Sequence, residues 1–301
     1  MPFGRPCGLR LRSKLERCIE RILLIATAIA AVAIISILLL LAYFCLPLFT
    51  SGELGEVFSR RWQPFAGSYG ILPMCAGSFA ISLLALFLAF PGAVAICFFV
   101  HSLAPAPAAG LLKTLVHFMT GIPTVIYGFV SVFLLVPLMR DWLSAGTGFT
   151  LLTAAITLSL LILPTIVLVF QARLERIDPT LTLASAALGF TPIEQVRHVL
   201  IPASAQGLLV AAILGFGRAI GDTLISLMLA GNAAQFPVSL FVSIRTLTAH
   251  IALVLATDSQ SMAYRSVFAA GLVLFLLMGM INLLIQRIGR ADNEKTYEKD
   301  R

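Results

Sequence analysis

Charged residues are scarce in this sequence, and their scarcity limits the class of protein that it can encode. Aspartate, glutamate, lysine and arginine make up 12% of the 301 residues, which is roughly half the share found in soluble domains. Hydrophobic residues reach 59%, and the mean hydropathy is +0.99. A water-soluble domain is therefore excluded, and we expect an integral membrane protein.

Metal-binding and nucleotide-binding patterns are also missing. The five cysteines form no C-x-x-C pair, and the four histidines lack the spacing of metal ligands. We therefore expect neither a disulfide framework nor a metal site. The pattern G-x-x-x-x-G-K-[ST] is absent as well, so any ATP chemistry must come from other chains.

The basic residues are present but unevenly distributed. Of the 21, fifteen lie before residue 22, at Lys113, between residues 173 and 197, and after residue 286. Five lie in the alternate segments, and Arg218 lies inside a hydrophobic run. Because basic residues accumulate on the cytoplasmic side of membrane proteins, this pattern places both termini in the cytoplasm. It also accounts for the net charge of +7 without a nucleic-acid partner.

Six hydrophobic runs are long enough to cross a bilayer, which requires about 20 residues. We expect an all-α integral membrane protein of six transmembrane helices, of which the second is long enough to tilt or to bend at Pro91-Gly92. The first run is too long for a signal peptide and is kept as a span. The predicted domains are a basic cytoplasmic N-terminus over 1–21, a six-span domain over 22–286 and a charged cytoplasmic tail over 287–301. The six spans cover residues 22–46, 71–100, 111–139, 149–170, 207–231 and 267–285.

The fifth span carries two opposite charges. Arg218 and Asp222 are four residues apart, so a continuous helix over 207–231 would place them on one face. A charge at bilayer depth costs about 2.5 to 3.5 kcal/mol and normally faces a partner or an aqueous path. The pair therefore either neutralises itself inside the bundle or lines a substrate path. Gly217 and Gly221 form a G-x-x-x-G step, which allows a neighbouring helix to approach closely.

The third span is interrupted at Pro123. Proline removes a helical hydrogen bond, and Thr120, Thr124 and Tyr127 supply hydroxyl groups within one or two turns. Such a break is tolerated in a membrane where protein groups or a cavity satisfy the freed backbone. The segment is either a packing kink or part of a substrate path.

The loop over 173–206 is predicted to contain two short helices. Asp178 can cap the first, and Gly189 suits its C-terminal end. Thr191 and Glu194 form a capping box for the second, which reaches Leu200. The first helix has a small apolar face that fits a protein groove or folds onto its own bundle. This face contains Leu181, Ala184, Ala187 and Leu188.

The two-helix loop before a span with an arginine and an acid resembles the EAA loop of bacterial ABC importer permeases. The matching residues run from Leu183 to Gly189 and from Val199 to Pro202. The resemblance implies the type I importer permease fold, with a coupling helix that fits a groove of a cytoplasmic ATPase. Leu183 stands where the motif usually has glutamate. The implied coupling residues are Leu181, Ala184, Ser185, Leu188 and Gly189.

Within these families, the chain resembles the phosphate importer permeases of the PstC type. The most specific match is Gly215-Phe-Gly-Arg-Ala-Ile-Gly-Asp-Thr223, and Arg245-Thr-Leu-Thr-Ala249 belongs to a further matching segment. Asp222 stands where those permeases usually have glutamate. The resemblance implies a phosphate pathway through the bacterial inner membrane. Its candidate residues are Arg218, Asp222, Thr124 and Tyr127.

The resemblance also implies partners. They are a second related permease, an ATPase homodimer that binds ATP and Mg²⁺, and a periplasmic or surface-anchored phosphate-binding protein, all beside membrane lipid. Phosphonate, sulfate or molybdate remains an alternative cargo, and a secondary carrier is a further alternative. An intramembrane enzyme is disfavoured because the spans contain one acid and no cluster of catalytic groups.

Overall fold

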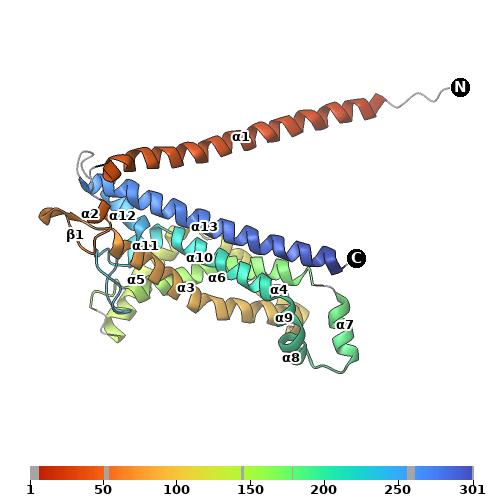
Figure 1. Cartoon of the computed structure of the whole chain (residues 1–301). Coiled ribbons are helices and arrows are strands. Elements are labelled where there is room, and N and C mark those ends of the chain that lie inside the picture. The colour runs from red at the N-terminus through yellow and green to blue at the C-terminus, as the bar shows by residue number, and fades with distance from the viewer. Residues whose placement is uncertain (1–6, 51–53, 144–145, 178, 256–261, 300–301) are drawn as a thin grey trace.

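The computed structural model describes residues 7–50, 54–143, 146–177, 179–255 and 262–299, and these residues are mostly helical. Five helices are long and apolar enough to cross a membrane, and a sixth span forms if the bent pair 192–203 and 205–221 is counted as one. The expected all-α membrane fold is therefore confirmed. Figure 1 shows the helices running roughly along one direction.

The elements follow one another as a helical series with one small hairpin. Their bounds are α1 Cys7–Thr50, α2 Leu54–Val57, β1 Trp62–Gln63, η1 Pro64–Ala66, β2 Ser68–Tyr69, α3 Leu72–Phe98, η2 Phe99–Leu103, α4 Ala106–Gly121, α5 Thr124–Trp142, α6 Leu151–Leu174, α7 Pro179–Ala187, α8 Pro192–Gln195, η3 Val196–Leu200, α9 Ile201–Ala203, α10 Ala205–Gly221, α11 Leu224–Leu229, α12 Leu247–Val254 and α13 Met262–Lys299.

The core is formed by α3, α6 and α10. On α3, Ala85, Ala89 and Ala93 repeat every four residues and are almost completely buried. Small side chains at this spacing let a neighbouring helix approach, which is how membrane helices gain packing contacts. The facing side of α6 fills the space with larger residues, including Ile162 and Phe170. The most buried span is therefore α6.

The two ends of the bundle differ, and we name them for their contents. The hairpin end carries β1, β2, α11 and α12, and the loop end carries α7, α8 and α9 (Figure 1). At the hairpin end the segment before α12 is tied to the start of α6. Ser243 Oγ donates to Phe149 O at 2.7 Å, and Leu151 N donates to Val242 O at 3.0 Å.

The first helix contacts the bundle mainly near the hairpin end. There the rings of Phe44 and Phe268 stack with centroids 4.4 Å apart, and Cys45 is buried. Toward the N-terminus α1 diverges from α13 (Figure 1). The apolar side chains of α1 are exposed over most of its length, as suits a surface that faces lipid or another chain.

Two helices are continuous where the sequence suggests a discontinuity. Helix α3 continues through Pro91 to Phe98. Helix α13 continues as one helix to Lys299, past the predicted start of the charged tail at residue 287.

The predicted helix over 207–231 is wrong, because the chain breaks at Asp222. Helix α10 ends at Gly221, Asp222 is extended with φ −75° and ψ 125°, and α11 begins at Leu224. Asp222 Oδ2 accepts a hydrogen bond from Ile225 N at 2.8 Å. The carboxylate therefore caps α11 by satisfying one of its unpaired N–H groups. Arg218 and Asp222 do not lie on one face of a continuous helix.

The crossing of α3 with the chain before α12 depends on Gly77. A Cβ atom placed there would lie 2.5 Å from the carbonyl oxygen of Arg245. We expect Gly77→Ala to cost about 1 to 3 kcal/mol of stability, because backbone must move to relieve the overlap. Thermal unfolding in detergent measures the loss. Gly279→Ala is the matched control, since open space surrounds its Cβ position, and an equal midpoint for both variants would contradict this packing.

The capping role of Asp222 can be tested separately from its negative charge. We expect Asp222→Asn to keep the stability of the α10–α11 break, because an amide oxygen also accepts from Ile225 N. Asp222→Ala should lose about 1 kcal/mol, since the N–H group is left unpaired. Thermal unfolding of both variants checks this, and identical losses would show that the carboxylate does not act as a cap.

Candidate functional site

Arg218 lies in the last turn of α10, and its side chain is exposed. Asp222 follows it by four residues at the break between α10 and α11, and Tyr127 lies in the first turn of α5, which packs against α11. Among the described residues, however, no ion pair within 4.0 Å joins Arg218 to a carboxylate, and Asp222 Oδ2 instead accepts a hydrogen bond from Ile225 N. Arg218 is therefore a cation with open hydrogen-bonding capacity beside a helix break.

At the break before α5, the Tyr127 hydroxyl pairs a backbone carbonyl that has lost its helical partner. In a continuous helix Met119 O would accept from the N–H of residue 123, but that residue is proline. The hydroxyl of Tyr127 donates to Met119 O at 3.0 Å instead. Tyr127 thus has a structural role, and its oxygen keeps lone pairs that can accept a hydrogen bond. The Thr124 hydroxyl has no partner among the described residues and is half-buried.

A hydroxyl network joins the Asp222 break to α12. Thr248 Oγ1 and Ser226 Oγ both donate to Asp222 O, each at 3.1 Å. Thr246 Oγ1 donates to Ser226 Oγ at 3.1 Å and lies 3.1 Å from Thr248 Oγ1. Sequence reasoning gave these residues no role, although the alternation in Arg245-Thr-Leu-Thr was visible. The network fixes α12 against α11.

Gly217 and Gly221 face α13. A Cβ at Gly217 would lie 3.3 Å from Ile281 Cγ2, and one at Gly221 would lie 3.0 Å from Met278 Cε. The glycine step therefore lies where α10 and α13 approach closely, and it is adjacent to Arg218 in the sequence.

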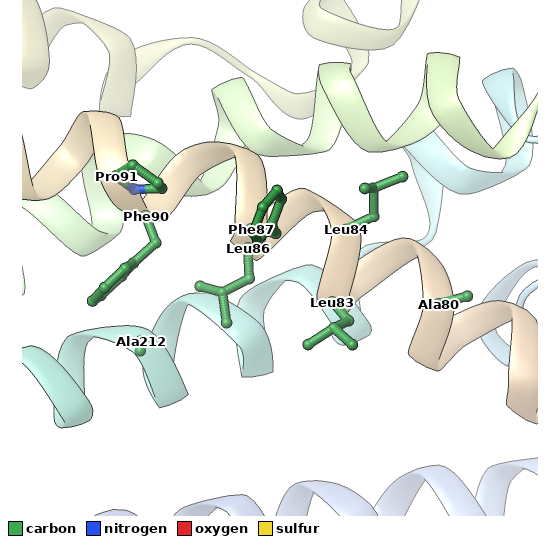
Figure 2. Close-up of a pocket in the computed structure, with 8 residues that line it drawn as sticks. All are labelled: Ala80, Leu83, Leu84, Leu86, Phe87, Phe90, Pro91 and Ala212. Atoms are coloured by element: carbon green, nitrogen blue, oxygen red, sulfur yellow. The ribbon is translucent and has the colours of Figure 1, made fainter. Parts of the chain in front are cut away.

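A large apolar groove lies along α3 and α10. It has a volume of about 740 Å³, and Figure 2 shows its lining side chains, most of which come from α3. These residues carry no charge and almost no polar surface, so a charged substrate would lose its hydration there without compensation. The groove is therefore a poor path for an anion. Its lining residues are Ala80, Leu83, Leu84, Leu86, Phe87, Phe90, Pro91 and Ala212.

In the loop over 173–206, the first helix ends at Gly189 as predicted. Phe190 N donates to Ser185 O and Gly189 N donates to Ala186 O, while Gly189 has φ +83°. This is a Schellman motif, and glycine adopts its left-handed position without a steric cost. The cap predicted at Asp178 lies outside the described residues.

The second helix of the loop starts with the predicted capping box. Thr191 Oγ1 accepts from Glu194 N, and Glu194 Oε2 accepts from Thr191 N at 2.8 Å. These hydrogen bonds lower the pKa of Glu194, because they stabilise its carboxylate form. The helix then widens into the π turn η3 instead of continuing regularly to Leu200.

The exposed face of α7 and the residue after it carry large apolar side chains. Leu183 and Leu188 are 69% and 77% exposed, and Leu181 and Ala184 are also exposed. Ser185 is instead buried, and its hydroxyl donates to Thr182 O at 2.9 Å. Ser185 therefore faces away from a surface partner, whereas the leucines face outward.

Among the described residues, no three histidine, cysteine, aspartate or glutamate side chains lie close enough together to hold a metal ion.

Comparisons with known proteins identify the family. A family model described as binding-protein-dependent transport system inner membrane component matches residues 94–291. The probable ABC transporter permease protein YqgH of Bacillus subtilis is 36% identical over 231 residues, covering 76% of this chain and 75% of that protein. The phosphate transport system permease protein PstC 2 of Mycobacterium bovis is 28% identical and covers 95% of this chain and 97% of its own.

Solved structures support the same architecture. A bacterial ABC transporter involved in the import of the acidic polysaccharide alginate aligns with a TM-score of 0.58 at 16% identity, over 92% of this chain and 99% of that one. The MetNI methionine ABC transporter aligns with a TM-score of 0.54 at 23% identity, over 74% of this chain and 94% of that one. At these identities the likeness concerns the fold. With the family match, it leads to one conclusion: the chain belongs to the inner membrane components of binding-protein-dependent transport systems and is an ABC importer permease subunit.

Proposed function

We propose that this permease forms part of the pathway that carries inorganic phosphate into the cytoplasm. The observation that carries the proposal is Arg218, an exposed guanidinium near a helix break with no carboxylate within ion-pair distance among the described residues. The relatives named as phosphate permeases, such as the 28% identical protein of Mycobacterium bovis, support the choice of cargo.

A guanidinium suits phosphate because its planar fork can bond two oxygens at once. Asp222 lies close enough to reduce the net positive charge, so that the anion is held without being trapped. Its Oδ2 is committed to Ile225 N, which leaves Oδ1 to accept from a protonated phosphate oxygen. We further propose that Tyr127 and Thr124, which both lie in the first turn of α5, add hydroxyl groups to this site. Sulfate has no proton at neutral pH and would leave these acceptors unpaired.

The energy source and the delivery of phosphate are assigned to partners. We propose that an ATPase homodimer binds ATP and Mg²⁺, because this chain has no phosphate-binding loop. A second related permease completes the pathway, and a periplasmic or surface-anchored phosphate-binding protein docks at the hairpin end. Both termini and the loop end then lie in the cytoplasm, in agreement with the distribution of basic residues.

The loop end supplies the contact with the ATPase in this proposal. The exposed leucines of α7 and the small side chain of Ala184 form an apolar surface that can enter a groove. Gly189 sets the turn after this helix through its positive φ.

The role of Arg218 can be tested against a purely structural role. We expect Arg218→Gln to reduce phosphate uptake by at least about tenfold, because hydrogen bonds to a charged group are worth about 1.5 to 3 kcal/mol. Arg218→Lys should also transport poorly, since an ammonium cannot make the forked contact. Uptake of labelled phosphate by the assembled transporter, with sulfate as competitor, is the measurement.

The double variant Arg218→Gln with Asp222→Asn is the control for charge balance. If the two residues only neutralised each other, removing both charges would restore the bundle and its transport. We expect no rescue, because the phosphate ligand is still missing. Near-normal uptake by the double variant would rule out Arg218 as a ligand.

The coupling surface gives a separate prediction. We expect Ala184→Glu to reduce recovery of the ATPase with the permease by at least about fivefold, because an apolar groove rejects an unpaired charge. Gly279→Ala, which adds volume in open space on α13, should leave recovery unchanged. Full recovery with normal transport in the Ala184→Glu complex would exclude α7 as the coupling helix.

A further inference from the structure

Arg245 is a second cation that has no carboxylate within 4.0 Å among the described residues. It is the only Asp, Glu, Lys or Arg residue between positions 223 and 257. The side chain is half-buried, and its Nε donates to Asn232 O at 2.9 Å. Within the described part of the chain, its terminal amino groups have no hydrogen-bond acceptor and no carboxylate within 4.0 Å.

Unused hydrogen-bond acceptors occur in the same region. Asn232 Nδ2 donates to Leu227 O at 2.7 Å, which fixes the amide orientation and leaves its buried Oδ1 without a partner in the described residues. His250 is completely buried in α12, outside the spans, and its Nδ1 is also without a partner there. Burial and the charge of Arg245 lower the pKa of His250 to about 3, so this ring is neutral at physiological pH.

Within the described residues, the unpaired donors of Arg245 and the unpaired acceptor of Asn232 indicate which kind of ligand could bind there. The arginine amino groups require an anion or water, whereas the Asn232 oxygen requires a donor. Hydrogen phosphate offers both, because it carries charged oxygens and an O–H group. A fully ionised oxyanion offers only acceptors and leaves the amide oxygen unpaired, which costs free energy in a buried position.

Arg245 and Arg218 lie at opposite ends of α11. Arg218 precedes the break that starts this helix, and Arg245 bonds to Asn232, which follows the end of the helix. Six residues of helix span about 9 Å. The hydroxyl network of Ser226, Thr246 and Thr248 links the two ends. The two arginines therefore lie near opposite ends of one short helix that the hydroxyl network holds against α12.

We propose that Arg245 and Asn232 form a second anion site at the hairpin end, which receives a protonated oxyanion of the phosphate class before it reaches Arg218. The proposal rests on the proposed function for the direction of transport and the cargo. Two sites in series let an anion enter favourably and still leave, because neither site has to bind it tightly.

A structural role for Arg245 is the competing explanation. Its Nε bond to Asn232 O ties the chain after α11 to the start of α12, and this contact alone could account for the residue. Glutamine at position 245 separates the two roles, since its amide can still donate to Asn232 O but has no charge and no fork.

The first experiment measures phosphate uptake by the complete transporter. We expect Arg245→Gln to lower the uptake rate at least about tenfold at unchanged yield of the complex, with Arg245→Lys in between. Arg265→Gln is the matched control, because it removes an exposed positive charge near the same end. Wild-type uptake by Arg245→Gln, or an equal loss in Arg265→Gln, would overturn the proposal.

The second experiment requires no transport. Phenylglyoxal modifies arginine, and mass spectrometry of the reacted transporter reports Arg245 and Arg265 separately. In nanodiscs of zwitterionic lipid, inorganic phosphate should slow modification of Arg245 at least about threefold more than sulfate at equal ionic strength, with no effect on Arg265. Equal protection by both anions, or by neither, would overturn the assignment.

A lipid headgroup shares the phosphate chemistry, and the membrane composition distinguishes the two sources. Protection of Arg245 by phosphatidylglycerol, regardless of added phosphate, would assign the site to lipid and overturn the proposal. If the wild-type transporter carries no phosphate, the proposed function fails, and the protection experiment alone then decides whether Arg245 binds the anion.

Discussion

The fold depends on the requirement that backbone polar groups within a bilayer find partners inside the protein. Two helix breaks show how this chain meets it. At Pro123 the carbonyl of Met119 is paired with the Tyr127 hydroxyl, and at Asp222 a carboxylate pairs with the N–H of Ile225. Polar side chains at both breaks therefore have a structural reason to be there, because they pair an interrupted backbone. Under the proposed function, the same residues would also contribute to the site for phosphate.

The positions of the spans could be predicted from hydropathy, because a lipid environment constrains the length and polarity of a helix more than its exact residues. The break at Asp222 was missed because the residue was interpreted only as the partner of Arg218 at helical spacing. An aspartate three residues before Ile225, at the start of an apolar run, is also a capping pattern. Hydropathy favours a continuous helix at this point, and the local cap determines the outcome.

At the loop end, by contrast, residues close in sequence were sufficient to predict where the short helices begin and end. The capping box of Thr191 and Glu194 and the stop at Gly189 depend only on residues close in sequence, and both are present. The burial of Ser185 could not be predicted in this way, because it depends on which side of α7 faces the rest of the chain. The same limit applies to Arg245, whose charge is visible in the sequence but whose half-buried position depends on the tertiary packing around it.

The isolation of α1 has a consequence for how this family varies. Most of its large apolar side chains are exposed, and its best-defined contacts lie near Phe44 and Cys45. A surface in contact with lipid is selected for hydrophobicity and length, so many different sequences can serve equally well. The family model begins at residue 94 and therefore omits this helix. We therefore expect the first span to tolerate substitutions that keep its length and hydrophobicity, and its composition could adapt to membranes of different thickness without altering the packing of the other helices.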